Sequence, residues 1–189
     1  MVDSSNYVGT NNFLQQLQFI KNNIRYYNLN PQCTHVSVVT YSSGVYNQFY
    51  LNQYHTIQEL NNAIDRIQYK PGEPNTGGAI NWVNTNAFTA ANGGRTGIPH
   101  YAVWVGGSSS SSPTMTVNAA NAGRQQGTMF FTVGVGNGYN IGELRGMTDN
   151  IDKNMFFSQN YNSLSTLAEP LATRLNGGEN LLKHTSSFI

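Results

Sequence analysis

Two side chains that could do chemistry stand at the start of the chain. Asp3 and Ser5 follow Met1 and Val2, which have the apolar character of a strand end, and they precede a long amphipathic helix. Beside the N-terminal end of a helix, Asp and Ser oxygens can accept backbone N–H groups with no metal present. A purely structural role is therefore open to both residues, next to any role as ligands.

Residue types typical of catalytic sites are scattered along the sequence. The histidines have no nearby carboxylate or cysteine with which to form a metal or catalytic set: His35, His55, His100 and His184. The sequence contains no Gly-x-Ser-x-Gly motif. Gly134, Gly136 and Gly138 follow a predicted strand, but they lack the spacing of a phosphate loop and are interpreted as a turn. We therefore expect no enzyme, and keep an enzyme on a Rossmann-like fold only as a remote alternative.

The composition argues against nucleic-acid binding and membrane insertion. The 189 residues carry a net charge of +1, and 10% of them are charged, so no attraction to nucleic acid or to an anionic membrane is indicated. No apolar run approaches the ~18 residues that a membrane helix needs. Polarity comes from neutral groups, with 26 Asn and 11 Gln residues. Such a surface is poorly protected against self-association, although a lineage bias toward Asn would give the same composition.

The single cysteine, Cys33, excludes an internal disulfide. It precedes an apolar segment, where a buried thiol and an intermolecular disulfide are both open interpretations.

Apolar segments of strand length alternate with amphipathic segments, which predicts a parallel sheet covered by helices on both faces. The predicted helices span residues 11–27, 56–67, 79–88, 115–126, 141–147 and 164–175. The predicted strands span residues 35–41, 45–51, 101–105, 129–135 and 155–157, together with the stub before Asp3. A short turn joins the strands 35–41 and 45–51, so these two must be antiparallel neighbours.

This order predicts an α/β fold, a Rossmann-like doubly wound sheet that is mostly parallel with one antiparallel edge strand. Sites are expected in the crevice at the carboxyl ends of the strands. The residues expected in the core are Val38, Val39, Val103, Val105, Phe131 and Val133.

The order of these elements, with three local motifs, resembles the von Willebrand factor type A family over nearly the whole chain. The opening Asp3-Ser4-Ser5 is similar to the Asp-x-Ser-x-Ser motif that closes the first strand of that family. Residues 36–42 are similar to its second strand, and residues 134–144 to its fifth strand and the following helix.

The resemblance implies a metal-ion-dependent adhesion site, in which Mg²⁺ or Mn²⁺ is held by Asp-x-Ser-x-Ser, a Thr and a second Asp. Hard cations of this kind prefer oxygen ligands. Asp3 and Ser5 match the first two positions, but Tyr7, Pro74 and Gly106 stand at the other three. The metal site is therefore expected to be vestigial, with no cofactor. A substitute ligand from Thr76 or from the serines at 108–112, and hence an Mg²⁺ site, is the alternative.

The same resemblance sets the domain boundaries. Residues 1–176 are expected to form the domain and residues 177–189 a polar C-terminal tail or linker. A first strand of this kind needs about five or six apolar residues before its Asp, and two precede Asp3. We expect a segment of a longer polypeptide; a true start at Met1 is the alternative.

For function, the resemblance implies a non-catalytic protein–protein interaction module of an extracellular, secreted structural or matrix protein. The expected partners are copies of itself, neighbouring domains or matrix proteins such as collagen. The alternative is a metal-dependent adhesion domain that binds collagen or another matrix ligand.

Overall fold

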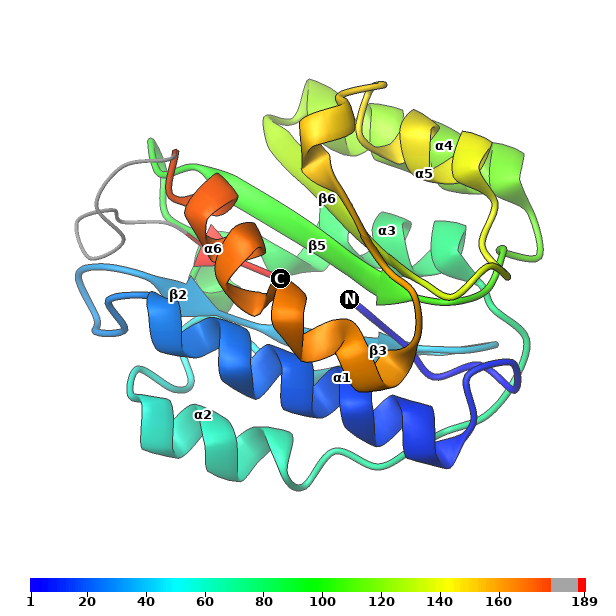
Figure 1. The fold of residues 1–189 in the computed structure, drawn as a ribbon. Helices are drawn as coiled ribbons and strands as arrows, with labels where there is room; N and C mark the ends of the chain where they lie inside the picture. Colours follow the sequence, from blue (N-terminus) through cyan, green and yellow to red (C-terminus); the bar gives the residue numbers. More distant parts are fainter. Residues whose placement is uncertain (178–186) are drawn as a thin grey trace.

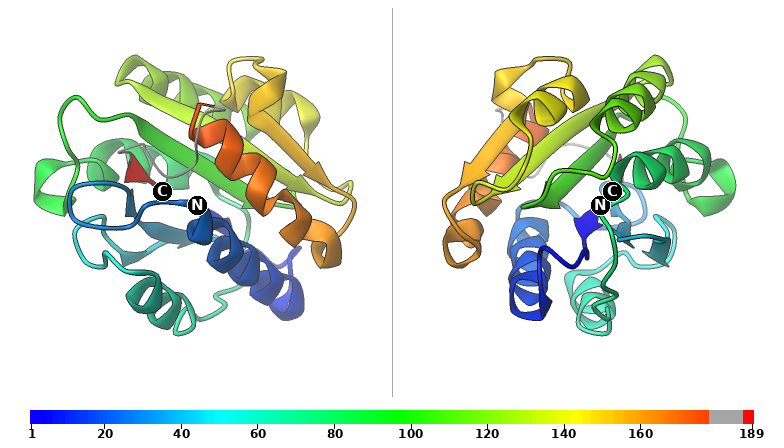
Figure 2. Two further views of the ribbon diagram at one scale, coloured as in Figure 1. Left: turned by 60° about the vertical axis from the view of Figure 1, so that its left-hand side comes forward. Right: turned by 90° about the vertical axis from the view of Figure 1, so that its right-hand side faces the viewer.

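The computed structural model describes residues 1–177 and 187–189. A single twisted sheet runs through the molecule, with helices on both faces (Figure 1, Figure 2). Its described strands are β1 (Val2–Asp3), β2 (His35–Val36), β3 (Val38–Tyr41), β4 (Val45–Phe49), β5 (His100–Gly106), β6 (Thr128–Val135), β7 (Met155–Ser158) and β8 (Ser187–Phe188). Every pairing is parallel except that of β3 with β4 at the edge. The predicted fold class is confirmed.

The order of the strands places β1 in the middle of the sheet, between β3 and β5. The short strands β2 and β8 pair with each other, and β8 also pairs with β5. Strands β6 and β7 continue the sheet beyond the other edge of β5. The predicted strand 35–41 is thus two strands, because the N–H of Ser37 donates to Phe188 O (2.8 Å) while its hydroxyl donates to Phe49 O (2.7 Å).

The described α-helices are α1 (Thr10–Asn23), α2 (Ile57–Ile64), α3 (Thr76–Trp82), α4 (Pro113–Gln125), α5 (Ile141–Met147) and α6 (Ala168–Leu175). Side chains of α1, α2 and α6 form one apolar cluster, and those of α3, α4 and α5 form another on the opposite face. Short 3₁₀ segments cover Ile24–Tyr26, Ala90–Asn92, Asp152–Asn154 and Tyr161–Leu167, and a π-helical segment covers Val83–Ala87. None of the helices in this described part has the length and apolar character that a membrane crossing demands.

Local sequence explains where several helices begin. Helix α2 starts at a capping box, in which the Thr56 hydroxyl accepts the Glu59 N–H and the Glu59 carboxylate accepts the Thr56 N–H. Helix α3 begins at Thr76, three residues before the predicted start, because the Asn75 side chain accepts the N–H of Gly78 and caps it. The last predicted helix, 164–175, is a 3₁₀ segment followed by α6.

Most of the predicted core is confirmed: Val38, Val39, Val105, Phe131 and Val133 are buried. Val103 is only partly buried, so that part of the prediction is wrong. The side chain of Val103 lines a small cavity in the sheet. Leu14 of α1 is 54% exposed.

The C-terminal end of the chain differs from the predicted polar tail. Ser187 and Phe188 form β8 inside the sheet, and Ile189 is buried as well. This strand was not predicted, because a segment of three residues is too short to show the alternation that indicates a strand. The rest of the predicted tail, residues 178–186, lies outside the described residues.

Candidate functional site

The carboxyl ends of β1, β5 and β6 face an open crevice of about 580 Å³. Its walls come from the loops that follow these strands, together with side chains from two other loops. The lining residues that matter below are Tyr7, Pro74, Gly107, Ser108 and Tyr161. This is the place at which a doubly wound sheet is expected to carry a site.

Asp3 is fully buried beneath this crevice, and both of its carboxylate oxygens accept hydrogen bonds. The N–H of Ser5 donates to Oδ1 (2.8 Å), and the hydroxyl of Ser108 donates to Oδ2 (2.5 Å). The hydroxyls of Ser5 and Ser108 lie 3.4 Å apart. Burial raises the pKa of Asp3, and the hydrogen bonds from Ser108 and Ser5 offset part of that rise. Protein donors thus occupy the carboxylate that would face a cation.

The hydroxyl of Thr76 takes part in a second hydrogen-bonded group. Its hydroxyl donates to the phenol oxygen of Tyr41 (3.1 Å), which also accepts the indole N–H of Trp104 (2.5 Å). All three side chains are buried. Burial, and to a lesser extent the charge of Asp3, raises the pKa of Tyr41 well above its usual value. Thr76 is therefore part of the internal packing beneath the crevice.

The backbone after β5 leaves no room for a second carboxylate. A Cβ atom at Gly106 would lie 2.6 Å from Trp104 Cζ2 and 2.9 Å from Asp3 Cβ. At Gly107 it would lie 2.5 Å from the phenol oxygen of Tyr161 and 2.8 Å from the carbonyl oxygen of Val135. Contacts this short require a shift of buried atoms. An acidic residue at either position cannot be accommodated by this packing.

Tyr7 and Pro74 stand at two further ligand positions of the motif, and neither has the Ser or Thr side chain that the motif places there. Tyr7 is 69% exposed, so its phenol stands out into solvent at the rim. Pro74 has no side-chain oxygen, and its carbonyl accepts the N–H of Ser111 (2.8 Å). The residues present therefore do not fit an octahedral Mg²⁺ site: one carboxylate remains, and it is already paired. Among the described residues no group of three or more His, Cys, Asp or Glu side chains could hold a metal ion.

The structure places Asp3 and Ser5 in contact, and it shows hydrogen bonds of Ser108 and Glu143 that the sequence did not indicate. Ser108 was one of five serines in a predicted loop, with no signal to separate it from its neighbours. Glu143 in α5 is 4% exposed; its Oε2 accepts the N–H of Ser110 (3.1 Å), while Oε1 has no hydrogen-bond partner among the described residues. Its position after Asn140, which caps α5, was the available signal.

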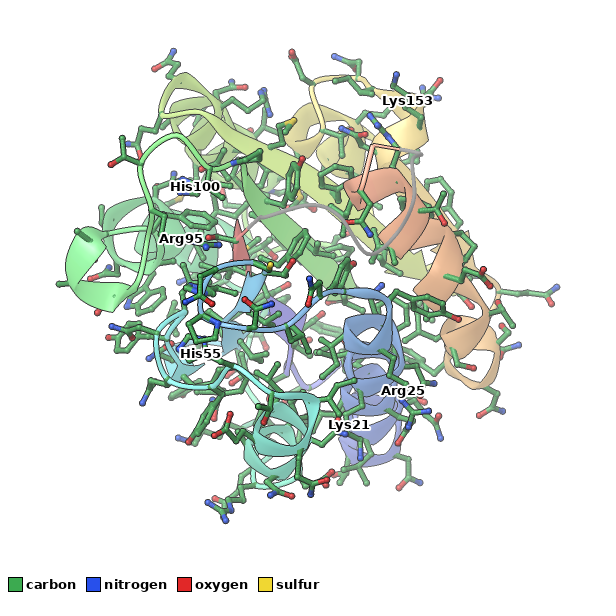
Figure 3. All side chains as sticks on the ribbon, turned by 90° about the vertical axis from the view of Figure 1, so that its left-hand side faces the viewer. Lys21, Arg25, His55, Arg95, His100 and Lys153 are labelled. Atoms are coloured by element: carbon green, nitrogen blue, oxygen red, sulfur yellow. The ribbon has the colours of Figure 1, made fainter. Side chains whose placement is uncertain are left out.

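In the described part of the chain no histidine belongs to a group that could hold a metal ion. The rings of His35 and His55 do lie 4.8 Å apart, and His100 stacks on Phe88 at 4.2 Å. Figure 3 shows His55 and His100 away from Lys21, and the labelled basic side chains are spread over the surface without forming one patch. Cys33 is half-buried and accepts a hydrogen bond from the Asn28 amide (3.4 Å).

Comparison with known proteins shows the family to which the chain belongs. The family described as von Willebrand factor type A domain matches residues 1–170, and the chain belongs to that family. Mouse collagen alpha-4(VI) chain is 26% identical over 189 residues, which is 100% of this chain and 8% of that protein. Chicken matrilin-1 is 27% identical over 176 residues, which is 93% of this chain and 35% of that protein. The chain thus spans well under half the length of these relatives.

Solved structures show the same fold. Proximal thread matrix protein 1 from the mussel byssus superimposes with a TM-score of 0.83 at 21% identity, over 90% of this chain and 45% of that one. Another structure of that mussel protein is described as having a zinc-occupied adhesion motif, at 20% identity and a TM-score of 0.83. At these identities the structural likeness establishes the fold.

Proposed function

We propose that this domain is a non-catalytic protein–protein interaction module of an extracellular structural or matrix protein, which associates with itself or with neighbouring domains without a cation. The observation that carries the proposal is the pairing of Asp3 with Ser5 and Ser108. It satisfies both carboxylate oxygens with protein donors. A cation at this carboxylate would compete with these hydrogen bonds.

The relatives support the same class of role. They include a collagen chain and a structural neighbour named as a thread matrix protein. With 10% charged residues and a net charge of +1, little electrostatic repulsion keeps copies of the chain apart. Exposed tyrosines such as Tyr7 provide contact area with a polar tip, which suits an interface. Extracellular matrix proteins are the partners that we propose, and secretion is part of the proposal.

A metal-dependent adhesion domain that binds collagen or another matrix ligand is the second candidate. One observation favours it: the hydroxyls of Ser5 and Ser108 converge on Asp3, which brings three oxygen-bearing side chains together. An enzyme has less support, because no histidine lies among the residues that line the crevice.

Two measurements separate the candidates. Calorimetric titration with Mg²⁺ and Mn²⁺ should give no heat of specific binding, and Asp3→Ala should behave as the unchanged protein does. A micromolar site that Asp3→Ala abolishes would establish the adhesion site instead. Sedimentation of the chain with and without EDTA should show the same self-association, whereas EDTA-sensitive association or ligand binding would contradict the proposal.

A further inference from the structure

The central strand of the sheet is built from both ends of the chain. Strand β1 begins at Val2, opposite Val105 of β5, and β8 continues its line, with Phe188 opposite Tyr101. On the other side Val2 lies opposite Thr40, and Phe188 lies opposite Val36. The residues opposite Phe188 and Val2 are four positions apart on both sides: Tyr101 and Val105 on one side, Val36 and Thr40 on the other. Phe188 therefore lies four strand positions before Val2. One position between Ile189 and Met1 is therefore unfilled.

The backbone hydrogen bonds follow this shared register. The N–H of Val103 donates to Ile189 O (2.6 Å), and the carbonyl of Val103 accepts the amino group of Met1 (2.7 Å). One residue of β5 thus binds both ends of the chain, as it would bind a continuous parallel strand across the missing residue. The N–H of Ile189 donates to Tyr101 O (3.0 Å), and Phe188 O accepts the Ser37 N–H on the opposite edge (2.8 Å). Both edges of the slot between β2 and β5 are paired in this way.

The side chains of residues 187–189 fit the slot as well as the backbone does. Phe188 is 5% exposed, with its ring centroid 4.5 Å from that of Tyr27 and 5.4 Å from that of Tyr101. Ser187 is fully buried, and Ile189 packs into the apolar cluster on the opposite face. The slot therefore selects an aromatic side chain on one face and an aliphatic side chain on the other.

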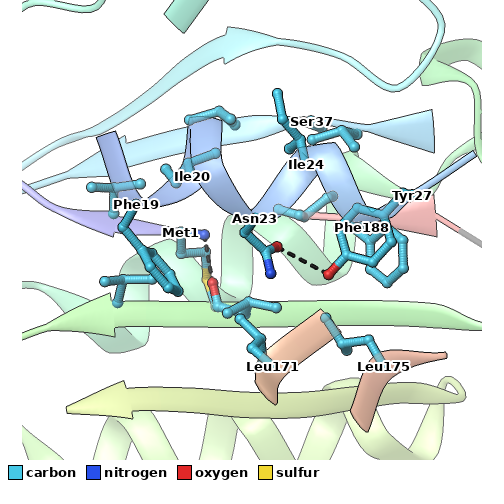
Figure 4. A pocket seen from close by; sticks show the side chains of 16 residues that line it. Met1, Phe19, Ile20, Asn23, Ile24, Tyr27, Ser37, Leu171, Leu175 and Phe188 are labelled. Atoms are coloured by element: carbon cyan, nitrogen blue, oxygen red, sulfur yellow. Dashed lines mark hydrogen bonds between the residues drawn. The ribbon is translucent and has the colours of Figure 1, made fainter. Parts of the chain in front are cut away.

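A small apolar cavity of about 50 Å³ lies at the break. Figure 4 shows Met1, Leu171 and Phe188 among the side chains around it, and the Met1 amino group donates to the carbonyl oxygen of Val103 on the neighbouring strand β5. Val103 lines the cavity and faces the unfilled position, which explains why it is only partly buried. The strand is thus joined across the break by β5, and no packed side chain fills the gap.

We propose that the slot between β2 and β5 is a strand-acceptor site, and that in the assembled protein residues 187–189 of a second copy fill it. The hydrogen bonds that hold β8 between β2 and β5 involve only the backbone of residues 187–189 on the side of β8. The same three residues of another copy can therefore make the same hydrogen bonds. Nine residues, 178–186, lie between Gly177 and Ser187, and a chain of that length can span up to ~30 Å. Exchange of an identical element is a low-cost route to association, and addition of a strand is a general mode of recognition. This inference rests on the proposed self-association and names its surface.

A peptide competition tests the proposal on the unchanged full chain. The protein is unfolded and refolded with an excess of a synthetic peptide of residues 183–189, and its mass is then measured by sedimentation in EDTA. Without peptide we expect dimers or larger species; with it the mass should fall at least twofold, to that of the monomer. The same peptide carrying Phe188→Asp is the control and should leave the assemblies intact.

Two other results are possible, and each overturns a different claim. If the assemblies persist with the peptide, strand exchange is wrong while self-association stands, and another surface carries it. If the unchanged chain is a monomer at every concentration, self-association is wrong and the exchange falls with it. As a second measurement, the full chain with Phe188→Asp should be monomeric, whereas the matched variant Phe157→Asp, altered at a half-exposed strand position, should still assemble. Assembly of the Phe188→Asp chain would also overturn the proposal.

Discussion

The two ends of β1 solve the same problem of buried polar groups in different ways. At the carboxyl end, the carboxylate of Asp3 is paired with Ser5 and Ser108. At the amino end, the backbone of β5 is paired with residues 187–189, taken from the far end of the chain. A metal site made by side chains needs particular residue types as ligands, and Tyr7, Pro74 and Gly106 do not supply them. A backbone ladder needs only a strand in register. We therefore predict that the carboxyl end of β1 binds no cation, and we propose that the slot at the amino end accepts a strand from a second copy.

The largest expected effect is at the amino end, where Phe188→Ala should lower the free energy of unfolding by about 3 kcal/mol, because a buried aromatic ring is lost. Chemical denaturation is the measurement. Phe157→Ala is the matched control: Phe157 is 43% exposed on β7, and its loss should cost about 1 kcal/mol or less. Equal losses in the two variants would mean that β8 is not part of the stable sheet, and the comparison would fail.

At the carboxyl end, Gly106→Ala tests whether the crevice is closed by packing. The new Cβ would meet Trp104 and Asp3, and overpacking of this kind costs about 2 kcal/mol. Gly142→Ala in α5 is the control, because a Cβ atom there would have one neighbour within 4 Å, the side-chain oxygen of Asn140 at 3.2 Å. Thermal unfolding should show a clear loss for the first variant only. An unchanged stability of Gly106→Ala would show that the position can take a side chain.

Ser108→Ala tests the contribution of the hydrogen bond between Ser108 and Asp3 to stability. It removes the donor to Oδ2 and leaves a buried carboxylate oxygen without that partner, at a cost of about 1.5 kcal/mol. Ser111→Ala, at an exposed position of the same loop, should change stability by roughly 0.5 kcal/mol or less. Denaturant unfolding of both variants is the check. A loss no greater than that of the control would contradict the proposed pairing.

The smallest effect is a change in pH dependence. Because burial raises the pKa of Asp3 in the folded state, the folded protein holds this proton to higher pH than the unfolded chain does. Ionisation of Asp3 therefore lowers stability as pH rises from about 4, the usual pKa of Asp, through the raised value. Asp3→Asn removes this titration, so its stability relative to the unchanged protein should increase over that window. Unfolding at a series of pH values measures it, with the exposed Asp152 changed to Asn as control. A constant difference across the window would show that the pKa is not raised.

Much of the fold could be predicted because local signals agree with tertiary packing. Alternating apolar segments predicted the parallel sheet, and the short turn before Val45 predicted the antiparallel edge strand. The predicted start of the helix 56–67 agrees with α2, because the capping box of Thr56 and Glu59 depends on residues only three positions apart. The residue types at Tyr7, Pro74 and Gly106 could also be read from the sequence, and the expectation that they abolish the metal site stays a prediction.

Tertiary structure alone decided how the remaining groups were paired. Ser108 was indistinguishable from its neighbouring serines until the fold placed it against Asp3, more than a hundred residues away in the sequence. The hydrogen bond from the Thr76 hydroxyl to the phenol oxygen of Tyr41 could likewise not be predicted from the sequence. The strand formed by residues 187–189 was invisible for the same reason. Three residues carry no periodicity, and their conformation is set by the open edges of β2 and β5, which come from distant parts of the chain.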